Sequence, residues 1–463
     1  MIIQIVDSIE NNSRLFGTNG VRGIFGRSLT LDMIIDLVHS LGTYWDRGYI
    51  VLASDGRKSS HILSQVVQAS LNSDGFKVDN AGFIPTPCLQ YSTKRHGYTG
   101  GIMITASHNP AEYNGLKPIA KDGVEIHRQD ELTIEKIYRE KQFKKFTKPG
   151  VTYGREFIDS YINAVIDLVD FEKIKRRKFK IVMDLGNGVQ ALVAPSICKK
   201  LGCKVIPLNG NIDGDFPGRG SEPTPENLKE MSYVVKSSGA DFGVAYDGDG
   251  DRSLFCDNKG EVKWGDRTGA LLISYLLSEK HDKAEIVCPI NTTAAVSKIV
   301  KKLGSIVTYT KVGSVEVSRE MIKKKALLGL EENGGFMYGP LNEVRDGAMT
   351  TALMLEMLAN SDSTLSDMFY KLPTVYQHKT KFGIRDSSII GGLIQACVNH
   401  GRPTRIETVD GVKIWIDEET WIMIRPSGTE PILRLYAESN DKALLNSKVR
   451  EYTFLIDKIL QVN

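Results

Sequence analysis

Three carboxylates lie within five residues of one another in the segment 247–252, which reads D-G-D-G-D-R. Like charges at this spacing repel one another unless a hard cation takes their oxygens, and an all-oxygen ligand set favours Mg²⁺. We therefore predict that Asp247, Asp249 and Asp251 bind a metal ion. A solvated acidic turn is the simpler alternative. An EF-hand fits less well still, because the sixth and twelfth positions counted from Asp247 hold Arg and Asn where glycine and glutamate are required.

A second polar loop, 105–110, reads T-A-S-H-N-P and follows the apolar stretch 101–104. Its proline prevents a regular continuation. Ser107 has small neighbours and lies beside the imidazole of His108, so we expect an exposed hydroxyl that accepts and returns a group. Adjacent residues in a strand point to opposite faces, and a turn histidine without a catalytic role is therefore the simpler interpretation of His108.

Together these loops resemble those of the α-D-phosphohexomutase family, in which T-A-S-H-N-P carries the active-site phosphoserine and D-G-D-G-D-R holds Mg²⁺. Residues 16–23, F-G-T-N-G-V-R-G, resemble the opening G-T-x-G-x-R-G segment of that family. Residues 425–431, R-P-S-G-T-E-P, resemble its phosphate-binding loop. The four matches extend over nearly the whole chain.

The resemblance implies a mutase that interconverts hexose 1-phosphate and hexose 6-phosphate through phosphorylated Ser107. A hexose 1,6-bisphosphate would be both intermediate and activator, and one Mg²⁺ per chain would be held by the three aspartates and Ser107. Lys117 lies in N-G-L-K, which matches the family's N-G-x-K, and is the first candidate for the general base, with a pKa lowered by neighbouring cations. His108 is the second candidate. Arg22 and Arg252 match arginines that would stabilise the transferring phosphoryl group.

The C-terminal loop has the composition of a phosphate clamp. Arg425 offers a bidentate fork, Ser427 and Thr429 offer hydroxyls, and Gly428 leaves room for backbone amides to approach an anion. The resemblance implies that this loop grips the phosphate already on the substrate.

The expected sugar-binding loop departs from the family pattern G-E-x-S-G-H. Residues 330–335 read L-E-E-N-G-G, so Asn333 replaces serine and Gly335 replaces histidine, while Glu331 remains to bridge two sugar hydroxyls. A site with fewer directional hydrogen bonds rejects epimers less strongly. We therefore expect a phosphomannomutase/phosphoglucomutase that uses both glucose 1-phosphate and mannose 1-phosphate, and a phosphoglucosamine mutase is the alternative.

One α/β unit occurs three times, as a strand, a polar loop, a helix with apolar periodicity and a strand that begins with glycine. Generic similarity among β-α-β units is the simpler explanation. A third strand in each copy ends at Ser107, at the aspartates or at Glu331, and ligands collect at the carboxyl ends of such strands. The first strands are 49–55, 180–184 and 285–291, and the second strands are 75–78, 202–206 and 304–307.

After about Tyr370 the pattern changes, and strands at 412–416 and 421–424 flank the 425–431 loop. This pattern predicts an α+β domain that moves as a lid. The predicted fold is three similar α/β domains with mixed sheets plus this C-terminal domain, around one central cleft. The predicted boundaries are 1–151 for the phosphoserine loop, 152–256 for the metal, 257–370 for the sugar and 371–463 for the phosphate.

The composition is that of an ordinary globular protein, with 463 residues, 41% hydrophobic, and a formal net charge of +3. This charge is too close to zero to favour nucleic acid or a membrane as partner, and no apolar run reaches the roughly 20 residues of a membrane span. Six cysteines form no C-x-x-C pair, which argues against a zinc site or a disulfide framework and favours the cytoplasm. The basic run 172–180 is expected to be a solvated linker. The sequence does not predict the oligomeric state.

Functions of other classes fit less well. A phosphatase of the haloacid dehalogenase type needs D-x-D-x-[TV] after its first strand, whereas residues 55–59 read D-G-R-K-S. No G-x-x-x-x-G-K-[ST] occurs, so a P-loop kinase is excluded. A non-catalytic sugar-phosphate sensor would be expected to lack Ser107 or one of the aspartates, and all four are present. An enzyme is favoured.

Overall fold

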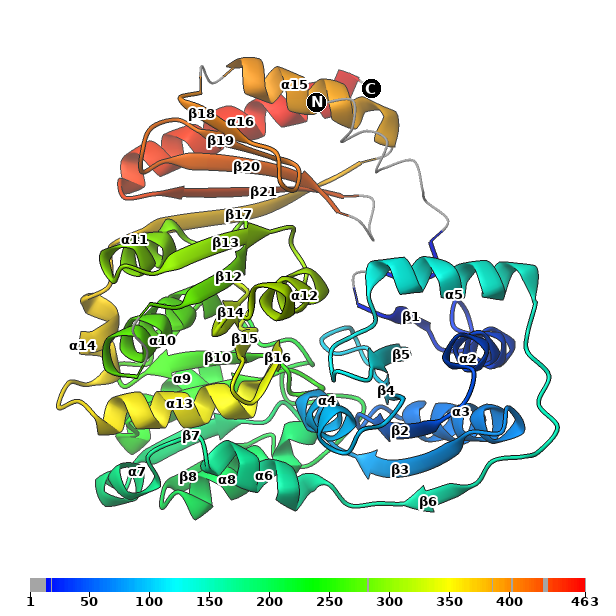
Figure 1. Ribbon diagram of the computed structural model, residues 1–463. Helices are drawn as coiled ribbons and strands as arrows, with labels where there is room; N and C mark the ends of the chain where they lie inside the picture. Colours follow the sequence, from blue (N-terminus) through cyan, green and yellow to red (C-terminus); the bar gives the residue numbers. More distant parts are fainter. Residues whose placement is uncertain are drawn as a thin grey trace.

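The computed structural model describes residues 14–17, 19–280, 283–384, 386–400, 403–427 and 432–462. Within them the chain forms four sheets, each with its own helices, and the fourth sheet lies above the third in Figure 1 while the first lies to one side. Three α/β domains are followed by an α+β domain, as the sequence predicts. None of the described helices combines the length and the apolar composition needed to cross a membrane.

The first sheet has the order β1-β5-β4-β2-β3-β6 and carries the Ser107 loop after β4. Its edge strand β6 lies at residues 152–154, just beyond the predicted end of the first domain at residue 151. The predicted domain boundaries stay predictions. The strands are β1 Val21–Ile24, β2 Tyr49–Ser54, β3 Lys77–Phe83, β4 Gly100–Ile104, β5 Tyr113–Ala120 and β6 Thr152–Gly154. The helices are α2 Leu31–Trp45, α3 Ser60–Ser73, α4 Thr86–Arg95 and α5 Arg128–Glu140.

The second sheet has the order β11-β10-β9-β7-β8 and carries the aspartates between β9 and β10. The expectation of a linker at 172–180 is wrong, because the side chain of Asp170 caps a helix there and Ile174 is buried. The strands are β7 Lys180–Asp184, β8 Lys204–Leu208, β9 Phe242–Tyr246, β10 Ser253–Asp257 and β11 Val262–Lys263. The helices are α6 Ile158–Ile166, α7 Phe171–Arg177, the short 3₁₀ helix η1 Val189–Leu192, α8 Ala194–Lys200 and α9 Lys229–Ser238.

The third sheet has the order β13-β12-β14-β15-β16. Helix α13 is apolar nearly all round and is buried along its length, so it packs in the core shared by the first three domains. The strands are β12 Glu285–Pro289, β13 Ile306–Thr310, β14 Leu328–Leu330, β15 Phe336–Tyr338 and β16 Asn342–Arg345. The helices are α10 Gly265–Glu279, α11 Ala294–Lys302, α12 Ser314–Lys324, α13 Gly347–Ala359 and α14 Leu365–Tyr370.

The repeat is confirmed by the sheets themselves. The orders β3-β2-β4-β5, β8-β7-β9-β10 and β13-β12-β14-β15 are equivalent, and in each the fourth strand is antiparallel to the third. The first three strands of each set are parallel. Equivalent strand ends therefore carry Ser107, the aspartates and Glu331.

The fourth sheet is antiparallel and has the order β17-β21-β20-β19-β18. Alternation along β20 places Ile422 and Ile424 in the core of this domain, whereas Trp421 and Met423 pack with Ile290 of the third domain. The strands are β17 Tyr376–Gly383, β18 Arg405–Glu407, β19 Val412–Trp415, β20 Trp421–Pro426 and β21 Ile432–Ser439. The helices are η2 Ser387–Ile389, α15 Ile390–His400 and α16 Lys442–Val462.

Candidate active site

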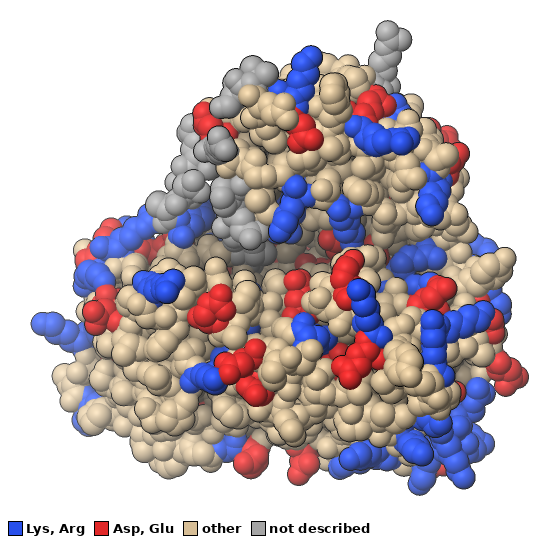
Figure 2. Space-filling model, turned by 180° about the vertical axis from the view of Figure 1, so that it is seen from behind, with Lys and Arg blue, Asp and Glu red and all other residues tan. Residues whose placement is uncertain are grey.

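Polar loops of the first three domains meet at one place. The Oγ of Ser107, after β4, donates to the Oδ2 of Asp247, after β9, at 2.7 Å. Arg345, the last residue of β16, donates to Asp251 at 2.6 Å and to Glu331 at 3.2 Å. The predicted convergence of three strand ends is therefore confirmed. Seen from behind, the surface is hollowed beneath the fourth domain, and side chains of both charges border the hollow (Figure 2).

Ser107 differs from its prediction in one respect, because its side chain is buried and not exposed. The aspartate loop packs directly on it, and a Cβ at Gly248 would lie 2.7 Å from the carbonyl oxygen of Ser107. Ser107 has a φ of +50°, a left-handed conformation that non-glycine residues adopt rarely and that concentrates at functional sites. The same conformation removes the alternation expected of a strand, and Nδ1 of His108 lies 3.4 Å from the Oγ of Ser107.

The Ser107 loop is held by Arg57, a residue that the sequence analysis did not select. Its guanidinium donates to the carbonyl oxygens of Ser107 at 2.8 Å, Asn109 at 2.7 Å and Tyr113 at 2.9 Å. Its Nε pairs with Asp55 at 3.0 Å, and both side chains are fully buried. The signal in the sequence that could have pointed to Arg57 is the polar segment D-G-R, residues 55–57, which directly follows β2.

Replacing Arg57 by alanine is expected to lower the free energy of unfolding by about 3–5 kcal/mol, because it leaves a buried carboxylate and several carbonyl groups without their partner. Urea denaturation of the two proteins measures the difference. Lys58→Ala is the matched control, since this neighbouring side chain is exposed and solvent screens its ion pair with Asp215, so its loss should change stability little. Equal stability of Arg57→Ala and Lys58→Ala would contradict the assigned role.

The aspartate cluster has the properties of a cation site. Each of Asp247, Asp249 and Asp251 offers a carboxylate oxygen, these oxygens lie within 4.8 Å of one another, and all three residues are buried. The Oδ1 atoms of Asp249 and Asp251 are buried and accept no hydrogen bond from any described residue. Burial, together with the charges of the other two carboxylates, raises the pKa of Asp247 to about 8. Carboxylate oxygens this close, two of them without a hydrogen-bond partner among the described residues, fit Mg²⁺.

Lys117 is also part of this cluster, but its pKa does not follow the prediction. Its Nζ lies 2.9 Å from the Oδ2 of Asp249 and 3.2 Å from that of Asp251. Burial alone would lower the pKa of Lys117, but these two carboxylates outweigh it, and the pKa is raised. The expected lowering is therefore wrong, because anions and not cations are its nearest charged neighbours. Asp249 also accepts from the hydroxyl of Thr86 at 2.7 Å, a contact the sequence did not indicate.

Basic groups surround the Ser107 loop. Arg22 donates to the carbonyl of Ala106 at 3.1 Å and to Oδ1 of Asn109 at 2.9 Å, and burial lowers its pKa to about 10. The guanidinium of Arg252 lies 3.9 Å from the nearer oxygen of Asp251. Burial, followed by the charges of Arg252 and Arg22, holds the pKa of His108 well below its ordinary value.

The predicted sugar-binding loop, residues 330–335, forms a tight connection from β14 to β15. Glu331 is buried, its N–H donates to the carbonyl of Gly335 at 2.7 Å, and the Oδ1 of Asn333 accepts from the N–H of Gly335 at 3.2 Å. Glu332 pairs with Lys379 of β17 at 2.5 Å, so the loop also contacts the fourth domain. The sequence did not indicate Arg345, which joins Glu331 to Asp251.

The predicted phosphate clamp is described only in part. Nε of Arg425 donates to Asp410 at 2.6 Å, and the same carboxylate oxygen accepts from the N–H of Val312 in the third domain. The N–H of Ser427 donates to the carbonyl of Ile432 at 2.9 Å. Arg425 is thus anchored where the third and fourth domains meet, whereas Gly428 and Thr429 lie outside the described residues.

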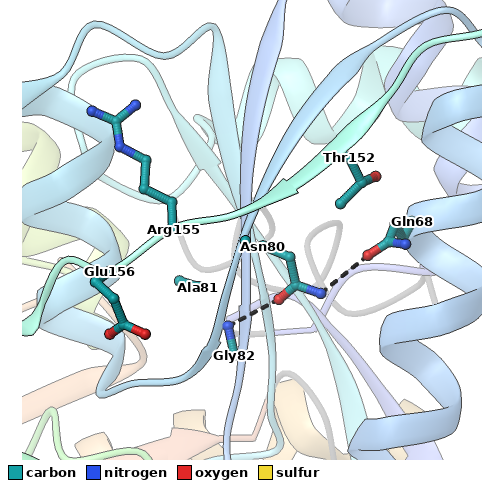
Figure 3. Close-up of a pocket in the computed structure, with 8 residues that line it drawn as sticks. Gln68, Asn80, Ala81, Gly82, Thr152, Arg155 and Glu156 are labelled. Carbon is teal, nitrogen blue, oxygen red and sulfur yellow. Dashed lines mark hydrogen bonds between the residues drawn. The ribbon is translucent and has the colours of Figure 1, made fainter.

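A further hollow lies at the edge of the first sheet, lined by residues of β3, of β6 and of α3, and has a volume of about 490 Å³ (Figure 3). Asn80 donates to Gln68 at 3.1 Å and accepts from the N–H of Gly82 at 2.9 Å within it. None of the residues that line it belongs to the loops described above. Its lining residues are Gln68, Asn80, Ala81, Gly82, Thr152, Gly154, Arg155 and Glu156.

Comparison with known protein families gives a match for each domain. The family "Phosphoglucomutase/phosphomannomutase, alpha/beta/alpha domain I" matches residues 13–145, and domains II and III match 159–260 and 264–376. The C-terminal domain of the same family matches residues 397–451.

Relatives are similar over nearly their whole length. A phosphoglucosamine/phosphogalactosamine mutase of Sulfurisphaera tokodaii is 41% identical over 453 residues, covering 96% of this chain and 99% of the relative. A phosphoglucomutase/phosphomannomutase of Thermococcus kodakarensis is 37% identical over 457 residues, covering 97% and 98%.

Solved structures share the fold. A phosphoglucomutase/phosphomannomutase family protein of Burkholderia thailandensis has a TM-score of 0.86 and 25% identity, with 96% of this chain and 97% of that chain covered. An N-acetylphosphoglucosamine mutase of Aspergillus fumigatus, solved with GlcNAc-6P and magnesium, has a TM-score of 0.61, 15% identity and 99% coverage of each chain, a likeness that shows the fold alone.

Proposed function

The chain belongs to the phosphoglucomutase/phosphomannomutase family, the α-D-phosphohexomutases, and from this we propose that phosphorylated Ser107 transfers its phosphoryl group to and from a hexose phosphate. The enzyme is a phosphomutase, an intramolecular phosphotransferase acting on sugar phosphates. In the proposed reaction a hexose 1-phosphate becomes a hexose 1,6-bisphosphate and leaves as hexose 6-phosphate. The contact between Ser107, at its left-handed φ, and the buried aspartates carries this proposal.

The residues around Ser107 suit a phosphoryl carrier. A phosphoserine adds about −1.5 to −2 charge at neutral pH, so the site must offset charge beyond that of its aspartates. Asp247, Asp249, Asp251 and a phosphoserine oxygen would hold Mg²⁺, which supplies positive charge that stabilises the transferring phosphoryl group. Arg22 and Arg252, beside the loop, would stabilise the same charge.

Proton transfer is assigned to Lys117 or His108. A sugar hydroxyl must lose its proton as it attacks, and the leaving serine oxygen must regain one when the phosphoryl group departs. Nδ1 of His108 lies near the Oγ of Ser107, and Nζ of Lys117 lies within the aspartate cluster, so both side chains border the place where the hydroxyl must enter. The kcat values of Lys117→Met and His108→Asn distinguish the two candidates. The variant that lacks the proton-transfer group should lose more kcat.

Both ends of the substrate need a partner, because the bisphosphate must turn before its second phosphate returns to Ser107. Glu331 and Asn333 are proposed to contact the sugar in either orientation. Arg425, Ser427, Gly428 and Thr429 are proposed to grip the phosphate that is not reacting, and the Asp410 contact would hold the Arg425 fork in place.

We expect turnover of glucose 1-phosphate and mannose 1-phosphate, with kcat/KM values within about a hundredfold of each other. The reason is the loop 331–335, which has neither the serine nor the histidine of the family pattern. Glucosamine 1-phosphate is the second candidate, favoured by the 41% identical relative named for amino sugars.

The experiment measures kcat/KM for all three sugar 1-phosphates with Mg²⁺ and glucose 1,6-bisphosphate. A preference of more than about a thousandfold for the amino sugar would replace the first candidate by the second. No turnover of any of the three would contradict the proposed function itself.

A further inference from the structure

Glycine at position 335 is not required by its backbone. Among the glycines of this loop only Gly334 has a left-handed φ, of +94°, whereas Gly335 adopts a backbone conformation open to other residues. What limits position 335 is space. A Cβ there would lie 2.4 Å from the Cδ and 2.9 Å from the Cγ of Arg345.

Arg345 cannot easily move away from such a Cβ, because the end of its side chain is held at two points. Nη1 donates to the Oε2 of Glu331 at 3.2 Å, and Nη2 donates to the Oδ2 of Asp251 at 2.6 Å. The side chain is buried, and the charges of these two carboxylates raise its pKa against the effect of burial. Met337 of β15 pairs with Arg345 in the sheet, which fixes the backbone from which the side chain extends.

We propose that Arg345 is a positioning residue that sets sugar specificity, and that Gly335 is glycine to make room for it. Through one guanidinium, Arg345 holds the carboxylate of Glu331 at a fixed place relative to Asp251 and the Ser107 loop. This inference rests on the proposed function, in which Glu331 binds sugar hydroxyls. Arg345, a side chain of β16, then orients Glu331 at the point where the loop has Gly335 and therefore no side chain of its own.

The arrangement affects specificity because a carboxylate that is held rigidly distinguishes hydroxyl positions better than one that can rotate. If Arg345 is lost or displaced, Glu331 keeps its charge but loses its orientation. Loss of hydrogen bonds to a charged group corresponds to about a ten- to hundredfold loss in binding. The loss should be greater for the sugar whose hydroxyls Glu331 fits best, so that discrimination between epimers declines.

The test compares Gly335→Ala, Arg345→Ala and the double variant, using glucose 1-phosphate and mannose 1-phosphate. Each single variant is expected to lower kcat/KM for the better substrate by about ten- to a hundredfold and to reduce the ratio between the two substrates by about fivefold or more. The double variant should be no worse than the more severe single variant, since both remove the same contact. Arg345→Lys should recover part of the loss, because it restores the charge but not the fork.

Gly154→Ala is the matched control, because a Cβ there meets no atom within 4 Å and its φ is not left-handed. It should match the wild type in both kcat/KM and substrate ratio. Melting temperatures show whether a variant is folded. If Arg345→Ala does not fold, Gly335→Ala alone decides, and its binding of glucose 1-phosphate is measured by calorimetry on a Ser107→Ala background.

Wild-type kinetics of Gly335→Ala, or losses that are equal for both sugars and additive in the double variant, would overturn the inference. Neither result would affect the proposed function. That proposal fails separately, if the unmodified enzyme turns over no hexose 1-phosphate.

Discussion

Replacing Ser107 by alanine is expected to lower the turnover of hexose 1-phosphate by at least about 10⁴-fold, because the variant has no oxygen to carry the phosphoryl group. The effect on the fold should be small. The hydroxyl donates one hydrogen bond to Asp247, and losing it should cost about 1–2 kcal/mol of unfolding free energy. A coupled assay for hexose 6-phosphate measures the first quantity, and thermal denaturation measures the second.

Ser221→Ala is the matched control for this experiment. Ser221 is also buried, and its hydroxyl donates to the carbonyl of Asn109 in the same loop at 2.8 Å. Losing that hydroxyl removes a loop contact without removing the proposed carrier, and turnover should stay within about tenfold of the wild type. Equal turnover by Ser107→Ala and Ser221→Ala would refute a phosphoserine mechanism.

Replacing Asp249 by asparagine is expected to lower turnover by about 10³-fold and to weaken Mg²⁺ binding at least about a hundredfold, since it removes a charged ligand from a buried cluster. Thr86→Val should have a smaller effect, about ten- to a hundredfold, because Thr86 acts on the metal only by orienting Asp249. Calorimetric titration with Mg²⁺ and the metal dependence of turnover measure both effects.

Asp257→Asn is the control for charge alone. Asp257 is buried in the same domain, but its Oδ1 accepts from the N–H groups of Lys259 and Glu261 in a turn. Its replacement should leave Mg²⁺ affinity unchanged. Full turnover after exhaustive treatment with a chelator, or unchanged Mg²⁺ affinity in Asp249→Asn, would rule out the assigned metal site.

The sequence predicted well those features that depend on residues close together in the chain. The strand ends at Ser107, Asp247 and Glu331 followed from short apolar runs that stop at polar loops, and the threefold repeat followed from their recurrence. Equivalent positions in a repeated unit must lie at equivalent sheet ends, so the meeting of the three loops could also be predicted.

Features that depend on distances between remote residues could not be predicted in this way. Arg57 contacts the carbonyl of a residue 50 positions away, and the short polar segment that contains it does not show that partner. Arg345 contacts an aspartate of another domain, and no motif marks its role. The sign of the pKa shift at Lys117 depends on which charges lie nearest, and the sequence shows the charges but not their separation. The burial of Ser107 likewise depends on a loop about 140 residues away, since Asp247 covers it.

The most direct test of the account locates the phosphoryl group itself. The protein is incubated with Mg²⁺ and glucose 1,6-bisphosphate, digested, and the peptide that contains residues 105–110 is analysed by mass spectrometry, with Ser107→Ala as the parallel sample. The account predicts a single phosphate on Ser107, still present after turnover of excess hexose 1-phosphate because each cycle returns a phosphate to this serine, and absent from the alanine variant. Full mutase turnover with no phosphate on Ser107, or with the phosphate on another residue, would contradict it.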